Sequence, residues 1–471
     1  MRKTKIICTL GPASANRDVI AQLLREGMDA ARFNFSHGTH ASHRELLELL
    51  RRTCREEGRI VATILDTKGP EIRIGTFAEG PVTLSEGGSF TLTPKEVPGD
   101  KTKVSVTYAD LARDVHIGDR ILLDDGLIEL QVAGLSGGDV LCTVLSGGVL
   151  SNNKSINVPD VNISLPGLTS RDRSDIKFAV EQDFDYIAVS FVRSAADILA
   201  VRDLLRSLGN TDIRLIAKIE NREGVNNLDE IIAAADGVMV ARGDLGVEIP
   251  MEEIPFLQKE MIRKGVRAGK PVIVATQMLD SMIRQPRPTR AEVSDVANAV
   301  FDYASGVMLS GETASGKYPV EALRTMVRTV TEAEDHIDYQ KRFQEEHFSV
   351  GGSVTDAISH AGCAAAFDLH ANAIITVTHA GVTARMISRF KPSCPICAAT
   401  VSEKVCRQLR LSWGVYPTMT KPAGNTDELF AAAVEACRKA GYIQDGNLVV
   451  ITAGVPVGRS GTTNLIKVEI I

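Results

Sequence analysis

Residues 213–244 read IRLIAKIENREGVNNLDEIIAAADGVMVARGD, two apolar, largely β-branched runs separated by a helical pattern. Each run has the length of a buried strand, and the segment between them is long enough for one crossover helix. Strands joined in this way lie parallel in a sheet. Both runs end in charged residues, Lys218 and Glu220 in the first and Asp244 in the second. The stretch therefore predicts two parallel strands whose charged ends meet at one edge.

The same unit recurs along the chain. Similar runs lie at 5–10, 30–35, 59–66, 186–191, 271–278 and 306–312, which makes eight expected strands with those at 213–220 and 237–244. A helical pattern follows each run, and the last helix is expected over about 319–336. Eight βα units in series match a closed (β/α)8 TIM barrel, whereas an open doubly wound sheet usually has five or six strands. The sequence predicts an α/β chain built on such a barrel.

One interval, between the third and fourth strands, is too long for a single helix. Its residues 70–166 show alternating apolar positions, many glycines and hairpin signals such as Asp125-Gly126 and Gly137-Gly138. We expect an inserted β-barrel domain there, with 1–69 and 167–345 forming the catalytic barrel. Because the insertion follows the carboxyl end of a barrel strand, it hangs over the face where such barrels keep their active sites. It is placed to act as a lid.

A further α/β domain is expected over 350–471. After a polar stretch, a helix begins near Val354, and strands with intervening helices are expected near 373–378, 395–400, 415–419, 448–453 and 465–470. Five strands are enough for a separate C-terminal sheet.

Composition excludes several classes of protein. The 471 residues carry a net charge of −6 without long runs of one sign, so we expect no nucleic-acid partner. No apolar stretch reaches the ~18 residues of a membrane span, and Gly11-Pro12 ends the first apolar run before a signal peptide would be complete. Eight scattered cysteines fit reduced thiols in the cytoplasm. Cys394 and Cys397 have metal-ligand spacing but no second pair, so we interpret them as packed core residues.

Polar residues gather at the expected strand ends. Arg32, Asn34 and Ser36 share one face of their strand, whereas Phe33 and Phe35 share the other. A buried arginine requires a partner, so this face is either a satisfied internal network or a binding site. Lys218 and Glu220 likewise share a face, either as a structural ion pair or as catalytic groups.

Two other strand ends carry charged groups. Glu220 and Asp244 come from neighbouring strand ends, and two carboxylates can hold one Mg²⁺ with room for phosphate and water. The third strand ends in a group that is either a hinge or part of the site: Asp66, Thr67, Lys68, Glu71 and Arg73. Convergence of four strand ends on one face favours a site for a phosphorylated anion.

The chain resembles the pyruvate kinase family over nearly its whole length. The matching segments, in the family's order, are KIICTLGPAS, RFNFSHG, LDTKGPEIR, ILLDDGLI, AKIENREGV, VARGDLGVEIP, ATQMLDSMIRQPRPTRAEVSDVANAVFD and MLSGETASGKYPVEA. Several of these segments are ten or more residues long. The resemblance implies transfer of the phosphoryl group of phosphoenolpyruvate to ADP, giving pyruvate and ATP in the last step of glycolysis, through a Mg-stabilised enolate.

The resemblance also implies residue roles at the active site. Catalysis falls to Lys218, Arg32 and Thr276. The substrate is bound by Arg32, Lys218, Gly243, Asp244 and Thr276. Glu220 and Asp244 hold Mg²⁺ or Mn²⁺, and the K⁺ ligands are Asn34, Ser36, Asp66 and Thr67. The nucleotide is contacted by Asn34, His37, Arg73 and Lys154. Asn153 stands where the family often has a second lysine, which puts the contribution of the lid in doubt.

The same resemblance implies regulation and assembly. Many members bind a phosphorylated effector in the C-terminal domain, and the matching residues are Thr378, Thr383, Arg459, Ser460, Gly461 and Thr462. His379 and Val382 depart from the usual first loop, so an ordinary loop and turn stay open as the alternative. A cytoplasmic homotetramer is the family expectation.

Two other functions would explain part of the sequence pattern. A barrel aldolase or lyase that stabilises an enolate would need no nucleotide, and the inserted domain with Arg73 and Lys154 argues against it. A catalytically silent sensor of phosphorylated metabolites would be expected to lose Lys218 or a metal carboxylate, and this chain keeps both.

Overall fold

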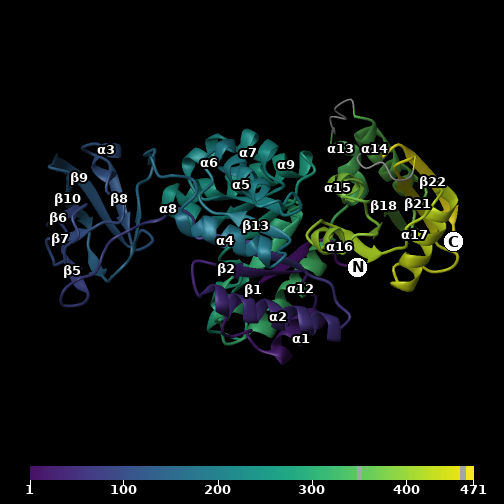
Figure 1. Cartoon of the computed structure of the whole chain (residues 1–471), viewed down its shortest axis with the longest axis horizontal. Coiled ribbons are helices and arrows are strands. Elements are labelled where there is room, and N and C mark those ends of the chain that lie inside the picture. Colours follow the sequence, from purple (N-terminus) through teal and green to yellow (C-terminus); the bar gives the residue numbers. More distant parts are fainter. Residues whose placement is uncertain (347–352, 457–462) are drawn as a thin grey trace.

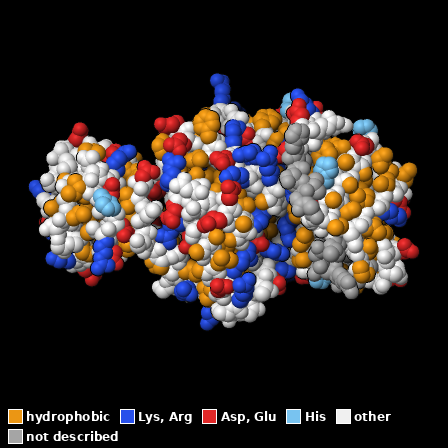
Figure 2. Space-filling model, turned by 90° about the horizontal axis from the view of Figure 1, so that it is seen from above, with side chains coloured by type: hydrophobic (Ala, Val, Ile, Leu, Met, Phe, Trp, Pro, Cys, Tyr) orange, Lys and Arg blue, Asp and Glu red, His pale blue; other side chains and the backbone are white. Residues whose placement is uncertain are grey.

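The computed structural model describes residues 1–346, 353–456 and 463–471. It consists of three lobes in a row, with the insertion at one end, the barrel in the middle and the C-terminal domain at the other end (Figure 1). Figure 2 shows the insertion as a separate lobe beside the barrel.

The central lobe is a closed barrel of eight parallel strands. In spatial order they are β1 (Lys5–Leu10), β17 (Gly306–Leu309), β16 (Val272–Ala275), β15 (Gly237–Ala241), β14 (Arg214–Ile219), β13 (Tyr186–Val189), β3 (Ala62–Asp66) and β2 (Ala30–Asn34). The predicted TIM barrel is thus confirmed. The third strand begins three residues later than expected, because Arg59 and Ile60 lie exposed before the chain enters the barrel, and β14 and β16 each begin one residue later.

Helices surround this barrel. They are α1 (Arg17–Glu26), α2 (His40–Glu56), α4 (Ser170–Glu181), α5 (Ala195–Ser207), α6 (Arg222–Asn226), α7 (Leu228–Ala234), α8 (Arg242–Glu248), α9 (Ile254–Arg267), α10 (Arg290–Phe301), α11 (Gly311–Ala314) and α12 (Pro319–Asp335), with 3-10 turns at Met251–Glu253 and Asp280–Ile283. Several begin with a capping box, in which Thr39, Thr169 or Thr289 exchanges hydrogen bonds with the residue three positions later.

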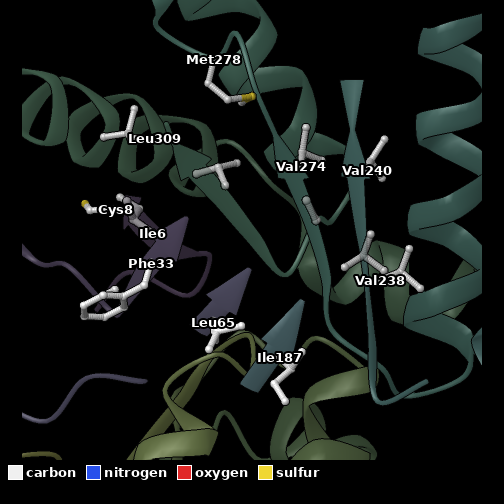
Figure 3. Close-up of a cluster of buried hydrophobic side chains, with 14 of the residues drawn as sticks. Ile6, Cys8, Phe33, Leu65, Ile187, Val238, Val240, Val274, Met278 and Leu309 are labelled. Atoms are coloured by element: carbon white, nitrogen blue, oxygen red, sulfur yellow. The ribbon is translucent and has the colours of Figure 1, made fainter. Parts of the chain in front are cut away.

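Alternate residues of the barrel strands pack into two different hydrophobic clusters. Ile6, Phe33 and Leu65 point outward and pack with helix residues in the largest apolar cluster (Figure 3). Ile7 and Ile216 belong instead to a cluster made only of strand residues and Leu411, which lies inside the barrel. Because side chains alternate along a strand, the residues that continue this inward face toward the carboxyl ends are determined by the sequence.

The insertion is a β domain. Its main sheet has the order β4 (Ile72–Arg73), β12 (Ser155–Asn157), β8 (Arg120–Leu123), β9 (Ile128–Ser136), β10 (Asp139–Ser146), β6 (Ser89–Thr93) and β7 (Lys103–Ser105). A bridge between Ile74 and Val106 joins the two edge strands, so the sheet closes on itself as expected. A two-stranded sheet of β5 (Val82–Leu84) and β11 (Gly148–Leu150) and the short α3 (Leu111–Asp114) complete this lobe, the lid.

The C-terminal domain has a five-stranded sheet in the order β20 (Val415–Met419), β19 (Ile396–Thr400), β18 (Ala373–Val377), β21 (Leu448–Ala453) and β22 (Leu465–Ile470). Its helices are α14 (Val354–Asp368), α15 (Val382–Arg389), α16 (Glu403–Leu409) and α17 (Thr426–Lys439). The polar stretch before it contains α13 (Tyr339–Glu345). The last strand differs from the rest, because β22 pairs antiparallel with β21.

Candidate active site

The inward faces of the barrel strands turn from apolar to polar at their carboxyl ends. On β2 the inward residue Ala30 is followed by Arg32 and Asn34, and on β3 Ile64 is followed by Asp66. Asn34 and Asp66 are register partners across the two strands. Beyond Ile216 on β14, Lys218 and Glu220 continue the inward face. The predicted strand-end residues therefore converge on the barrel face beneath the lid.

Lys218 lies at the centre of this group and is buried. Its Nζ lies 2.8 Å from Glu220 Oε1 and 3.1 Å from Asp66 Oδ1, and it donates a 2.7 Å hydrogen bond to Ser190 Oγ. Burial alone lowers the pKa of Lys218, but Asp66 and Glu220 outweigh burial and raise it above its usual value. The ammonium is therefore a fixed positive charge inside the barrel mouth.

Asp66 holds Arg32 as well as Lys218. Arg32 Nε donates to Asp66 Oδ2 at 2.6 Å, and Arg32 Nη1 donates to Thr9 Oγ1 at 3.1 Å. Burial alone raises the pKa of Asp66, but the two cations outweigh it and hold the pKa below its usual value. One buried carboxylate thus positions two cationic side chains side by side.

Glu220 is fully buried and differs from Asp66. Burial raises the pKa of Glu220 to about 7; Lys218 acts against this shift, and the charge of Asp244 adds to it. Its Oε2 accepts a 2.6 Å hydrogen bond from Phe191 N, whereas no hydrogen bond reaches Oε1 among the described residues, leaving the Lys218 ion pair. A carboxylate oxygen with spare lone pairs is available to a further cation.

Asp244 lies on α8, the short helix that directly follows strand β15. Gly243 N donates a 2.7 Å hydrogen bond to Thr276 Oγ1, which places the predicted substrate residues Gly243 and Thr276 in contact. Arg242 anchors the same turn by pairing with Asp295 at 2.7 Å and donating to Thr276 O at 2.7 Å. Asp244 itself is exposed on a cavity of about 450 Å³ between lid and barrel.

These carboxylates suit a divalent ion. Mg²⁺ usually takes one or two protein carboxylates and completes its shell with water and substrate phosphate. Glu220 Oε1 has unused lone pairs, and Asp244 is close enough to shift the pKa of Glu220. No cluster of three or more His, Cys, Asp or Glu is found in the part of the chain that the structure describes. The pair fits an ion that is shared with a bound substrate.

The four predicted K⁺ ligands also lie near one another. Asn34 Oδ1 accepts a hydrogen bond from Ser36 N at 3.1 Å, and Phe35 N donates to Asp66 O at 2.9 Å. Thr67 is joined to β13, since its N donates to Ala188 O at 3.0 Å. All four supply oxygen atoms, as a hard cation prefers.

The predicted nucleotide residues occupy two places. Asn34 and His37 line a cavity of about 930 Å³, together with Thr9 and Arg32, at the barrel mouth. Arg73 and Lys154 lie on the lid, and both are already paired. Arg73 Nη2 lies 2.6 Å from Glu71 Oε1, and Lys154 Nζ lies 2.8 Å from Asp124 Oδ1.

The candidate effector residues are only partly visible. Thr378 N donates to Ala399 O at 3.0 Å, and Thr383 Oγ1 lies 2.7 Å from Thr463 Oγ1, so the first turn of α15 contacts Thr463. Arg459, Ser460, Gly461 and Thr462 lie outside the described residues.

Sequence reasoning missed two members of the site. Ser190 continues the inward face of β13 and contacts Lys218 Nζ, Thr67 O and Asp66 Oδ1. The pattern that identified the other site residues, a polar residue on the inward face of a strand end, applies to Ser190 equally. Phe191 has a left-handed backbone with φ +54°, which aims its N–H at Glu220, and a phenylalanine gives no sequence signal for that conformation.

The rest of the chain has ordinary features. All eight cysteines are free, and Cys394 and Cys397 are buried. Within the described ranges, no helix combines the length and apolar character that crossing a membrane requires.

Comparisons with known proteins identify the family. Residues 1–323 match the family model "Pyruvate kinase, barrel domain", and residues 356–469 match "Pyruvate kinase, alpha/beta domain". A pyruvate kinase of Clostridium acetobutylicum is 48% identical over 472 residues, covering 100% of both chains. One of Geobacillus stearothermophilus is 50% identical, covering 100% of this chain and 80% of its own. The crystal structure of a pyruvate kinase from Cryptosporidium parvum superimposes with a TM-score of 0.95 at 40% identity, over 100% of this chain and 96% of that one.

The geometry of the described residues agrees with these matches. A lidded barrel with charged groups at its carboxyl rim and a separate α/β domain are present in one chain. This chain belongs to the pyruvate kinase family, a family of phosphotransferases.

Proposed function

We propose that this enzyme transfers the phosphoryl group of phosphoenolpyruvate to ADP, producing pyruvate and ATP in the last step of glycolysis. The observation that carries the proposal is the Lys218 ammonium, buried and fixed between Asp66 and Glu220 at the barrel mouth. A preorganised cation at this position suits a reaction in which charge moves from a phosphoryl group to an enolate oxygen.

The catalytic residues would act through charge and position. Lys218 and Arg32 would bind the phosphoryl oxygens and offset their charge as the group leaves the enolate oxygen. Gly243, Asp244 and Thr276 would hold the carboxylate end of the substrate, and the hydrogen bond from Gly243 to Thr276 fixes the position of these two residues. Thr276 would orient the water that protonates the enolate carbon.

Two kinds of metal ion complete the proposal. Mg²⁺ or Mn²⁺, held by Glu220 and Asp244, would supply positive charge to the phosphoryl and enolate oxygens. K⁺, held by Asn34, Ser36, Asp66 and Thr67, would offset charge on the nucleotide side.

The nucleotide would lie between barrel and lid. Asn34 and His37 would contact it from the barrel cavity, and Arg73 and Lys154 would reach its phosphates from the lid. Both lid cations are paired with carboxylates, Arg73 with Glu71 and Lys154 with Asp124, and the phosphates of ADP would compete with these carboxylates.

Regulation and assembly follow the family. A phosphorylated effector would bind at Thr378, Thr383, Arg459, Ser460, Gly461 and Thr462. The functional units would be the catalytic barrel (1–69 and 167–345), the lid (70–166) and the regulatory domain (350–471). A cytoplasmic homotetramer would cover exposed apolar side chains such as Phe256 and Ile470.

The proposal is tested by incubating the protein with phosphoenolpyruvate, ADP, Mg²⁺ and K⁺ and measuring pyruvate and ATP. Equal amounts of the two products are expected, and none without ADP. Pyruvate formed equally fast without ADP would identify a phosphatase instead.

A further inference from the structure

The lid touches the barrel helix that carries Asp244. Asn157, the last residue of β12, donates a 2.8 Å hydrogen bond from Nδ2 to Glu248 Oε1 at the end of α8. Beside this contact, a Cβ placed on Gly126 would lie 3.8 Å from Val247 Cγ1, so the lid hairpin also packs on α8. Two lid segments thus meet the last turn of one seven-residue helix.

The other end of α8 is fixed to the barrel. Gly243 N is bonded to Thr276 Oγ1, and Arg242 is bonded to Thr276 O and Asp295. Asp244 therefore lies on a short element that is held by the barrel at its first turn and by the lid at its last. Asn157, Asp244 and Glu248 line the same cavity of about 450 Å³.

Strand β12 connects this contact to the cations of the lid. Lys154 directly precedes the strand, and Ser155 is the register partner of Arg73 on β4. Ser155 Oγ also donates to Asp125 Oδ1 at 2.8 Å, which ties the strand to the hairpin that packs on Val247. Three residues of paired strand, Ser155 to Asn157, thus connect the position of Lys154 and Arg73 to Asn157.

The hydrogen bond from the lid depends on a single acceptor, the carboxylate of Glu248. Burial raises the pKa of Glu248, and the hydrogen bond from Asn157 acts against that shift. In the described part of the chain, Asn157 is the only hydrogen-bond donor to Glu248. Loss of the donor leaves this half-buried carboxyl group without a hydrogen-bond donor among the described residues.

We propose that Asn157 and Glu248 are positioning residues that couple the lid to Asp244, so that nucleotide contact with the lid and divalent-cation binding at Glu220 and Asp244 strengthen each other. The inference rests on the proposed function for the roles of Asp244, Arg73 and Lys154. Coupling of this kind is reciprocal, because each ligand must change the affinity of the other by the same factor.

The test begins with Mn²⁺ alone, titrated into substrate-free protein and followed by the electron paramagnetic resonance signal of free Mn²⁺. We expect Asn157→Ala and Glu248→Ala each to weaken Mn²⁺ binding about three- to tenfold. The double variant should be no weaker than either single variant, because both remove one contact. Glu248→Gln should stay within about twofold of the parent, since its amide oxygen still accepts from Asn157.

Asn162→Ala is the matched control, because Asn162 lines the same cavity and its side chain makes no hydrogen bond within the described residues. It should leave Mn²⁺ affinity unchanged. Hydrogen exchange at the amides of α8 should accelerate in Asn157→Ala, but not in Asn162→Ala. Parent-like Mn²⁺ affinity in Asn157→Ala, or an equal loss in Asn162→Ala, would overturn the coupling.

Kinetics separate this inference from the proposed function. With phosphoenolpyruvate and saturating Mg²⁺, Asn157→Ala should raise the KM for ADP several-fold while kcat changes less than twofold. If the parent enzyme forms no ATP, the proposed function fails, whereas the Mn²⁺ titration still decides whether Asn157 and Glu248 position the cation site.

Discussion

At the scale of residues, one buried carboxylate, Asp66, positions two cations at the barrel mouth. Asp66 pairs with Arg32 on one oxygen and with Lys218 on the other, and Ser190 bridges Asp66 and Lys218. In the proposed function, both cations would already lie beside one another when a phosphoryl group binds. Such preorganised charge is usually the largest single contribution to catalysis.

Replacing Lys218 tests this centre directly. Lys218→Met should lower kcat at least ~10²-fold, because a fixed charge at the reacting group is lost, while the protein still folds and still binds phosphoenolpyruvate. Steady-state kinetics and thermal unfolding measure both. Lys177→Met, at an exposed lysine of α4, is the control. A near-normal kcat in Lys218→Met would exclude this lysine from the mechanism.

A second residue-scale prediction concerns K⁺. In the proposed function Glu71 would add negative charge near the phosphates. It pairs with Arg73 at 2.6 Å and lies 3.8 Å from Lys68. Glu71→Lys should weaken the dependence on K⁺ by supplying a fixed charge. Full recovery is not expected, because the new lysine repels Lys68 and Arg73. Activity is compared in K⁺ and in a large organic cation at constant ionic strength. Full wild-type activity in the organic cation would refute the K⁺ site.

At this scale the sequence predicts most of the charged residues of the candidate site, but it does not predict Ser190 or Phe191. Arg32, Asp66, Lys218 and Glu220 stand out because polar residues on an inward strand face break the apolar pattern. Ser190 obeys the same rule, but a small hydroxyl residue is a weaker signal than a charge. The left-handed backbone at Phe191 depends on tertiary contacts and is invisible in the sequence.

At the scale of elements, strand β12 brings together residues that lie far apart in the sequence. It carries Asn157, follows Lys154 and pairs with both β4 and β8. Counting strands and reading their alternation predicts the closed barrel, since each βα unit is local. The pairing of β12 with β4 joins residues about eighty positions apart, and no local pattern specifies it.

The lid cation Lys154 gives the prediction at this scale. Lys154→Ala should raise the KM for ADP or lower kcat, with little effect on phosphoenolpyruvate affinity, because its charge reaches only the nucleotide. Asp124→Asn should act in the opposite direction on the KM for ADP, since it releases Lys154 from its 2.8 Å ion pair. Initial rates at varied ADP test both variants. Unchanged kinetics of Lys154→Ala at every ADP concentration would remove the lid from nucleotide binding.

At the scale of the whole molecule, the barrel and the C-terminal domain share a polar interface. Asp29 pairs with Arg2 at 2.6 Å and with Arg410 of the C-terminal domain at 2.7 Å. Lys5 Nζ donates to Val415 O at 2.7 Å, and Leu411 closes the inside of the barrel. The sequence predicts both domains, but not these contacts, because docking of two folded units leaves no periodic pattern.

Asp29→Asn tests this interface. Burial alone raises the pKa of Asp29, but Arg2 and Arg410 outweigh it and hold the pKa below its usual value. The carboxylate therefore stabilises the fold above its unfolded pKa of ~3.9, and this stabilisation is lost as the pH falls through the lower folded value. Asp29→Asn should cost about 3 kcal/mol between pH 5 and 8, and the difference should shrink only below about pH 4. Urea unfolding at several pH values measures it. A pH-independent difference would assign the loss to packing.

The most direct test of phosphoryl transfer follows the phosphorus itself. Phosphoenolpyruvate, ADP, Mg²⁺ and K⁺ are mixed with the parent enzyme and, separately, with Lys218→Met, and ³¹P NMR spectra are recorded over time. The parent should convert the phosphoenolpyruvate signal into the γ-phosphate signal of ATP without free phosphate, and Lys218→Met should leave both substrates intact. Loss of phosphoenolpyruvate with release of inorganic phosphate, or an unchanged spectrum with the parent enzyme, would contradict phosphoryl transfer to ADP.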